Sequence, residues 1–445
     1  MGMSAVARLL MARGDTVSGS DQGTWPLALA LAADGADVAT EFDPKNVAGA
    51  DVVVRSSAYG DANPEVAAAR AAGTPVWKRE DAWRELARGK RVVAVAGTHG
   101  KSTTTALTWT ALRAGGLDPS LICGAVLRDL GTNAYAGQGD ILVIEADEYD
   151  RAFLFLEPEI AIVTNVEHDH IDVFPTYADV KQAFSRFASG IIRGGWLVAC
   201  VDDPGAAELA ARGGHLAGRQ VATYGMAAQA GYRVVELVQG ANGVTFDLVG
   251  PFDAPVPVSL RLAGAHNARN AAGALAAADA AGVPANAAAK SFATFSGTER
   301  RLEELGSARG ITIVDDYAHH PTEIRASIDA VRARTKGRVI VLFQPHTPSR
   351  LRAFFDDFAA ALRTADESIV AETFASAREG ADSRAGAKAL ASRAGGTYVA
   401  DAEEAARKLA ERARSGDLVL VLGAGDIRPA GIRLLEILRD RGSAA

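Results

Sequence analysis

Residues 91–105 read RVVAVAGTHGKSTTT, and this stretch decides how the fold of the chain is interpreted. The apolar run Arg91–Ala96 predicts a buried strand, Gly97–Gly100 predicts a tight turn, and Lys101 opens a sequence compatible with a helix. A glycine turn at a helix N-terminus presents backbone N–H groups and the positive end of the helix dipole to phosphate. We therefore expect an ATP-type phosphate site, with Lys101 near the β- and γ-phosphates and Ser102 near Mg²⁺.

The spacing of this loop departs from the usual GxxxxGK[ST] pattern, because two residues rather than four separate Gly97 from Gly100. The alternative interpretation is a glycine and threonine turn that only caps a structural helix. The order strand, turn, helix favours the phosphate site. The candidate phosphate-binding residues are Gly97, Thr98, Gly100, Lys101, Ser102 and Thr103.

Two later predicted strands end in acidic clusters. Ile141–Ile144 runs into residues 145–150, EADEYD, and Ile160–Thr164 runs into residues 165–170, NVEHDH. Ligands of open parallel sheets lie beyond the carboxyl ends of the strands, so both clusters can converge on the phosphate loop. Oxygen ligands favour Mg²⁺, with Glu145 as the first candidate. The alternatives are zinc at His168, Asp169 and His170, and two solvated loops.

The rest of the chain alternates strand and helix signals in three stretches, as in βαβ units with mainly parallel sheets. Predicted strands lie at 51–54, 196–200, 311–314, 339–343, 368–371 and 418–422, and predicted helices include the polar segment 77–90 and the Ala-rich segment 265–281. We predict an α/β protein with three tandem domains, spanning residues 1–89, 90–297 and 298–445.

The composition excludes several classes of protein. Hydrophobic residues make up 48% and charged residues 23%, which excludes wholesale disorder and fibrous architectures. A net charge of −7 gives no global reason to bind nucleic acid or an anionic membrane. No apolar run reaches the length of a membrane-spanning helix, and two cysteines are too few for a disulfide framework. We expect a soluble cytosolic protein, whose oligomeric state the sequence leaves open.

An ordered set of motifs along essentially the whole chain resembles the Mur ligase family, in which the two-residue gap of the phosphate loop is typical. The motifs are SGSD (18–21), GTHGKST (97–103), EADEYD (145–150), TNVEHDHID (164–172), GAHNARNAAGA (264–274), FSGTERRLE (295–303), DDYAHHPTEI (315–324), FQPHTPSR (343–350) and GAGDI (423–427).

The resemblance implies an ADP-forming ligase of peptidoglycan synthesis that uses ATP and Mg²⁺ to join L-alanine to the carboxylate of UDP-N-acetylmuramate through an acyl phosphate. It also implies a Rossmann-like first domain truncated at its start, a central P-loop ATPase-like parallel sheet, and a Rossmann-like third domain. The alternatives are a recycling ligase that adds a tripeptide to the same sugar nucleotide, a non-catalytic nucleotide-binding homologue, and a simple P-loop hydrolase. Folylpolyglutamate synthases share the phosphate loop but are less similar in the HHP and PHxxxR regions.

The resemblance also implies roles for individual residues. Catalysis would fall to Lys101, His170, Arg301 and His319, and Mg²⁺ would bind Ser102, Glu145 and His170. Beyond the phosphate loop, ATP would contact His266, Asn267, Asn270, Arg301, Asp315 and Asp316. The UDP-sugar would contact Gly2, Met3, Ser4, Asp21, Ser56, Ser57 and His99, and the amino acid would contact Tyr317, His319, His346 and Arg350.

Two departures from the family pattern concern this assignment. Some members carry arginine directly after the histidine of the PH motif, whereas this chain has Thr347, which leaves Arg350 as the expected partner of the alanine carboxylate. The chain begins with Met1-Gly2-Met3-Ser4, inside the family's GAGMSxxA motif, so the first strand and most of that turn are missing. We expect a misassigned start codon, the alternative being a truncated first domain with weakened binding of the sugar nucleotide.

Overall fold

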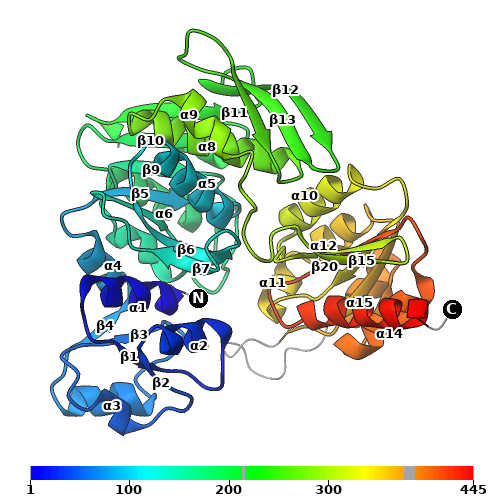
Figure 1. Cartoon of the computed structure of the whole chain (residues 1–445), viewed down its shortest axis with the longest axis horizontal. Coiled ribbons are helices and arrows are strands. Elements are labelled where there is room, and N and C mark those ends of the chain that lie inside the picture. Colours follow the sequence, from blue (N-terminus) through cyan, green and yellow to red (C-terminus); the bar gives the residue numbers. More distant parts are fainter. Residues whose placement is uncertain (1, 213–215, 375–385, 444–445) are drawn as a thin grey trace.

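The computed structural model describes residues 2–212, 216–374 and 386–443, and it arranges them as three α/β regions in chain order (Figure 1). Met1, where the sequence enters the family motif, lies outside the described residues. The predicted class, an α/β protein with three tandem domains and parallel sheets, is confirmed. In the described part of the chain, no helix combines the length and the apolar character that crossing a membrane requires.

The N-terminal region has four short strands in two separate parallel pairs, β1 with β2 and β3 with β4. Helix α1 buries Ala5, Val6 and Leu9 and packs against strands β6 and β7 of the central sheet. The predicted polar helix is α4, although Trp77 belongs to the strand before it. The elements are α1 (Gly2–Arg13), β1 (Ser18–Ser20), α2 (Pro26–Ala33), β2 (Asp37–Ala39), η1 (Pro44–Val47), β3 (Val53–Arg55), α3 (Pro64–Ala71), β4 (Val76–Lys78) and α4 (Arg79–Ala87).

The central region is built on a ten-stranded sheet in the order β14-β13-β12-β11-β10-β9-β5-β8-β6-β7. Strands β12, β11, β10, β9, β5, β8 and β6 pair in parallel, whereas β7 and the β12-β13-β14 meander add antiparallel edges. The strands are β5 (Arg91–Ala96), β6 (Ser120–Leu127), β7 (Thr132–Tyr135), β8 (Ile141–Glu145), β9 (Ile160–Val163), β10 (Trp196–Cys200), β11 (Gln220–Gly225), β12 (Tyr232–Gly240), β13 (Gly243–Val249) and β14 (Val256–Leu260).

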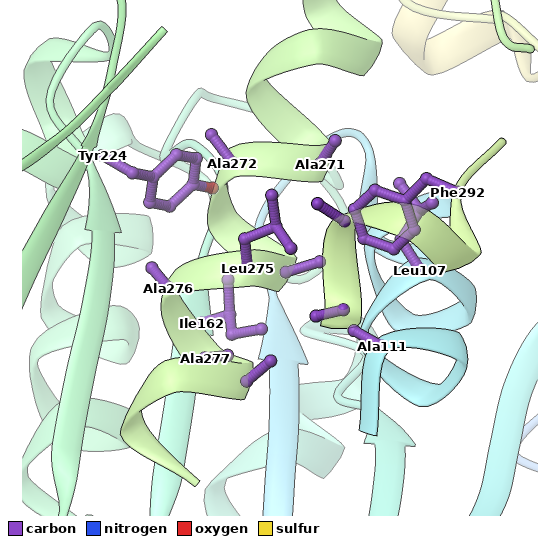
Figure 2. Close-up of a cluster of buried hydrophobic side chains, with 14 of the residues drawn as sticks. Leu107, Ala111, Ile162, Tyr224, Ala271, Ala272, Leu275, Ala276, Ala277 and Phe292 are labelled. Atoms are coloured by element: carbon purple, nitrogen blue, oxygen red, sulfur yellow. The ribbon is translucent and has the colours of Figure 1, made fainter. Parts of the chain in front are cut away.

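Helices cover both faces of this sheet and create two apolar cores. Figure 2 shows one core, in which the Ala-rich α8 presents Leu275 beside Ile162 of β9 and lies next to Phe292 and Leu107. The small residues bring α8 close to its neighbours, and a Cβ atom at Gly273 would lie 2.7 Å from the ring of Tyr224. The helical elements are α5 (Lys101–Ala114), η2 (Tyr149–Phe155), α6 (Tyr177–Ser189), α7 (Pro204–Ala211), α8 (Ala265–Ala280) and α9 (Ala285–Ser291).

The C-terminal region has a six-stranded sheet in the order β15-β16-β20-β17-β18-β19, parallel except for the edge strand β15. Its central strands are buried along their whole length because helices pack on both faces. The elements are β15 (Glu303–Ala308), β16 (Ile311–Asp316), α10 (Pro321–Arg332), β17 (Val339–Phe343), α11 (Pro348–Ala353), α12 (Phe355–Leu362), β18 (Glu367–Ala371), α13 (Ala387–Ala394), β19 (Thr397–Val399), α14 (Ala402–Arg412), β20 (Leu418–Leu422) and α15 (Arg428–Ser443).

Candidate functional site

The phosphate loop connects β5 to α5 in a conformation that two glycines make possible. Gly97 (φ 141°) and Gly100 (φ 78°) have positive φ angles, which side chains disfavour. A Cβ atom at Gly97 would collide with the Thr164 hydroxyl, and one at Gly100 would lie 2.8 Å from Asn270 Oδ1. The loop also receives support from the end of β9, since the backbone N–H of His99 donates to Asn165 Oδ1 at 2.7 Å. The glycines therefore allow β9 and α8 to approach the loop closely.

Lys101 is half-buried, with its side chain 14% exposed, and folds back over this loop. Its Nζ donates to the carbonyl oxygens of Gly97 (2.7 Å) and Thr98 (3.1 Å) and to the carboxylate of Glu148 (2.9 Å). Burial opposes the charge, but Glu148 and Asp147 outweigh it and raise the pKa of Lys101. The lysine therefore carries its positive charge at the loop. Glu148, within the first acidic cluster, is a site residue that the sequence analysis did not single out.

The three candidate metal ligands lie at the carboxyl ends of the central strands. Ser102 Oγ donates to Glu145 Oε1 at 3.0 Å, and Glu145 Oε2 accepts from the N–H of Gly124 at 2.6 Å. His170 has a positive φ of 49°, and its Nε2 lies 3.4 Å from Glu148 Oε1. The carboxylate of Glu145 and the hydroxyl of Ser102 are the oxygen donors that Mg²⁺ prefers, so this pair fits that ion. His170 offers a nitrogen and lies beside Glu148.

A cavity of about 310 Å³ lies between the phosphate loop and the C-terminal region. It is lined from the central region by Gly100, His266, Asn267 and Asn270, and from the C-terminal region by Arg301, Asp316 and Glu323, among others. Asn270 donates to Asn267 Oδ1 at 3.1 Å, which fixes both amides on the first turns of α8. Burial lowers the pKa of His266 to about 4, with Arg269 and Arg301 acting in the same direction, so this imidazole is neutral at pH 7.

The adjacent aspartates Asp315 and Asp316 have different surroundings. Asp316 lines the cavity, and burial raises its pKa to about 6 despite the nearby Arg301. Asp315 is fully buried and accepts from Arg428 at 2.7 Å and from Arg300 at 3.3 Å. Neighbouring residues of a strand point to opposite faces, which separates the two carboxylates.

The amino-acid candidates gather at the carboxyl end of the C-terminal sheet. The His319 ring lies 5.4 Å from that of Tyr317 and 6.0 Å from that of His346. Arg350 Nε and Nη2 donate to the two carboxylate oxygens of Asp169, at 2.8 and 3.2 Å, and Nη1 donates to His346 O. The side chains of Arg350 and Asp169 are only 7% and 5% exposed. The guanidinium proposed for the alanine carboxylate therefore holds a carboxylate of the central region.

A second set of contacts joins the two regions at His99. The imidazole lies between Glu323 of α10 (Nδ1 to Oε1, 3.4 Å) and Glu167 of the central region (Nε2 to Oε2, 3.6 Å). Burial opposes its charge, but the two carboxylates raise the pKa of His99 to about 10. Thr322 Oγ1 also donates to Glu167 Oε2, at 2.7 Å. The charged His99 links the phosphate loop to the start of α10.

The UDP-sugar candidates lie in two places. Gly2, Met3 and Ser4 form the first turn of α1, while Asp21, Ser56 and Ser57 follow strands β1 and β3. Asp21 Oδ1 accepts from the Tyr59 hydroxyl at 3.4 Å, which connects the segments after β1 and β3. His99 belongs instead to the phosphate loop and faces the C-terminal region.

A phosphate loop, acidic strand ends and a cavity between two α/β regions are typical of one class of protein, the nucleotide-binding α/β enzymes. Three family models match the chain: "Mur ligase family, catalytic domain" at residues 1–91, "Mur ligase middle domain" at 95–278 and "Mur ligase, glutamate ligase domain" at 300–425. The chain belongs to the Mur ligase family.

Individual relatives match nearly the whole chain. A UDP-N-acetylmuramate–L-alanine ligase of Arthrobacter sp. (strain FB24) is 45% identical over 98% of this chain and 93% of its own length. The solved UDP-N-acetylmuramate-alanine ligase of Thermotoga maritima has a TM-score of 0.83 and 25% identity, covering 99% of this chain and 97% of that one. A murein peptide ligase from Psychrobacter arcticus shares the fold, with a TM-score of 0.74, 23% identity and coverage of 98% and 96%.

Proposed function

We propose that this chain joins L-alanine to the carboxylate of UDP-N-acetylmuramate in peptidoglycan synthesis, converting ATP to ADP and phosphate. The observation that carries the proposal is the 45% identity to a relative of that name over 98% of the chain. The cavity between the phosphate loop and the C-terminal region supports it, because a ligase must bring a nucleotide and an acceptor together. ATP and a UDP-sugar are cytoplasmic metabolites, so the proposed location is the cytoplasm. The proposed domains are residues 1–89, 90–297 and 298–445, for the UDP-sugar, ATP and the amino acid.

The first proposed step transfers the γ-phosphoryl group. A carboxylate oxygen of the muramate attacks the γ-phosphorus, the bond to the bridging oxygen breaks, and ADP leaves. Lys101 exchanges Glu148 and the loop carbonyls for phosphate oxygens, while Arg301, which lines the cavity, balances charge on the transferring group. Bound Mg²⁺ neutralises phosphate charge, and Ser102, Glu145 and His170 would hold it. Asn267, Asn270, His266 and Asp316 contact the nucleoside. Asp315, the other aspartate proposed for ATP, holds Arg428 and Arg300 on the opposite face of the strand.

The second proposed step forms the amide. The alanine nitrogen attacks the acyl carbon, the carbon–oxygen bond to phosphate breaks, and the proton that the amine loses passes to the departing phosphate. Burial lowers the pKa of His319 to about 3, so the neutral imidazole can orient the amine without repelling an ammonium group. Tyr317, His346 and Arg350 complete the amino-acid site. Gly2, Met3, Ser4, Asp21, Ser56, Ser57 and His99 contact the sugar nucleotide.

The test is phosphate release from ATP with UDP-N-acetylmuramate and one acceptor at a time. Release that requires L-alanine supports the proposal, and Lys101→Ala should abolish it. Release that requires the tripeptide instead would identify a recycling ligase. Equal release without an acceptor would overturn the proposal in favour of a hydrolase, and absence of nucleotide turnover with all acceptors would favour a non-catalytic homologue.

A further inference from the structure

Glu323 lies on the first turn of α10, and its carboxylate, only 10% exposed, contacts candidate residues of all three substrate sites. Its Oε1 lies 3.4 Å from His99 Nδ1 and 3.5 Å from Arg301 Nη1, and its Oε2 lies 3.4 Å from His319 Nδ1. In the proposed function these three partners serve the sugar nucleotide, ATP and the amino acid, respectively.

The two oxygens of Glu323 have different tasks. Oε2 accepts from the backbone N–H groups of His319 (3.0 Å) and His320 (3.3 Å), as the third residue of a helix does in a capping box. That cap leaves Oε1 directed at the two cations, His99 and Arg301. A cap needs only an acceptor oxygen, whereas holding the buried His99 and the partly buried Arg301 as cations requires a negative charge.

The cations come from different parts of the chain. Arg301 follows the central region and stacks over Tyr317, with its guanidinium carbon 5.3 Å from the ring centroid. His99 sits on the phosphate loop, so its contact with Glu323 exists only when α10 is docked against the central region. Since His99 is buried and Glu323 is only 10% exposed, the charge of His99 depends strongly on its partner.

We infer that Glu323 is a positioning residue that couples docking of the C-terminal region to the alignment of Arg301 and His99 at the reacting carboxylate. The inference rests on the proposed function for the identity of the substrates. The carboxylate acts through its partners and takes no part in bond formation. Loss of the Glu323 charge therefore lowers activity by removing the contact between Glu323 and His99.

The substitution Glu323→Gln isolates this role, because the amide keeps an oxygen for the helix cap and removes the charge. The matched control is Glu404→Gln. Glu404 is likewise the third residue of its helix, α14, and accepts from the backbone N–H of Ala400 at 2.9 Å, but its charged partner is the surface residue Lys408. We expect Glu323→Gln to lower kcat/KM for L-alanine about 30-fold and Glu404→Gln to change it less than twofold.

A double-mutant cycle with His99→Asn distinguishes positioning from capping. If the two residues acted independently, the fold-decrease in kcat/KM of the double variant would equal the product of the two single fold-decreases. If Glu323 acts through His99, the fold-decrease of the double variant should be at least 10-fold smaller than that product. Additive effects, or equal effects of Glu323→Gln and Glu404→Gln, would overturn the inference. If Glu323→Gln does not fold, Glu323→Asp replaces it in the same cycle, because it keeps the charge and withdraws Oε1 from His99.

A binding measurement separates this inference from the proposed function. If the wild-type chain lacks alanine-dependent turnover, the proposed function fails. The double-mutant cycle then uses a binding measurement instead, the affinity of each variant for a non-hydrolysable ATP analogue in the presence of UDP-N-acetylmuramate. Coupling of at least 10-fold in that affinity supports the positioning role. Additivity there overturns it.

Discussion

The ion pair between Asp169 and Arg350 gives a quantitative prediction about how the two regions dock. Both side chains are almost fully buried, and both oxygens of Asp169 accept from the guanidinium. Removing one partner of a buried ion pair costs about 3–5 kcal/mol, because the other charge stays buried and unpaired. The two residues are 181 positions apart and belong to the central and C-terminal regions. Loss of the pair therefore destabilises the docked arrangement of these regions, which encloses the cavity.

For Asp169→Ala the expected result is a decrease in kcat/KM for L-alanine of about 10²- to 4 × 10³-fold, at about 1.4 kcal/mol per factor of ten. Asp169→Asn keeps one acceptor oxygen and should lose about half of that free energy. The measurement is alanine-dependent phosphate release. Asp172→Asn is the control, because its carboxylate accepts from Tyr149 near the surface at 3.1 Å.

Two results would refute this reasoning. Activity of Asp169→Ala within threefold of the wild type would mean that the pair does not hold the docked arrangement. A lower KM for L-alanine in this variant would mean that Asp169 competes with the substrate carboxylate for Arg350.

Three further predictions concern the metal, the fold and pH. Ser102→Ala or Glu145→Gln should raise the Mg²⁺ concentration for half-maximal activity about tenfold; an unchanged Mg²⁺ titration would remove both from the metal site. Arg428→Ala should destabilise the C-terminal region by about 2–4 kcal/mol in urea unfolding, because Asp315 stays buried without its closest cation; the control Arg433→Ala removes only exposed ion pairs and should unfold at the wild-type midpoint. The charged His99 should stabilise the fold fully below pH 6.5, and this stabilisation should be lost as pH rises through about 10, because folding raises the pKa of His99. If the difference in free energy of unfolding between the wild type and His99→Asn does not decrease from pH 7 to pH 10, this assignment is wrong.

The part of the fold that local sequence patterns determine could be predicted. The strand, loop and helix around Gly97–Gly100 follow from apolar runs and glycines close together in the chain, and the Ala-rich helix α8 matches its expected range to within one residue. The β12-β13-β14 meander was not predicted. Its strands are half-buried at the sheet edge, with β14 alternating between buried and exposed residues, and their pairing depends on the neighbouring strand.

The candidate site could be predicted as a set of residues but not as a set of partners. Asp169 pairs with Arg350 across 181 residues, which neither local segment indicates. Glu323 lies three residues after His320, a spacing that by itself indicates a helix cap and gives no sign of His99 or Arg301. Glu148 stands out in the acidic cluster through its contacts with Lys101 and His170, which lie in other segments of the chain. In each case the decisive signal is a contact distant in sequence.

The most direct test of the proposed reaction follows the oxygen atoms of the muramate carboxylate. UDP-N-acetylmuramate with both carboxylate oxygens replaced by ¹⁸O is incubated with ATP, Mg²⁺ and L-alanine, and the phosphate and the amide product are analysed by mass spectrometry. An acyl phosphate intermediate requires one ¹⁸O atom in the released phosphate and one in the new amide carbonyl. Unlabelled phosphate, released without alanine-containing product, would contradict the account.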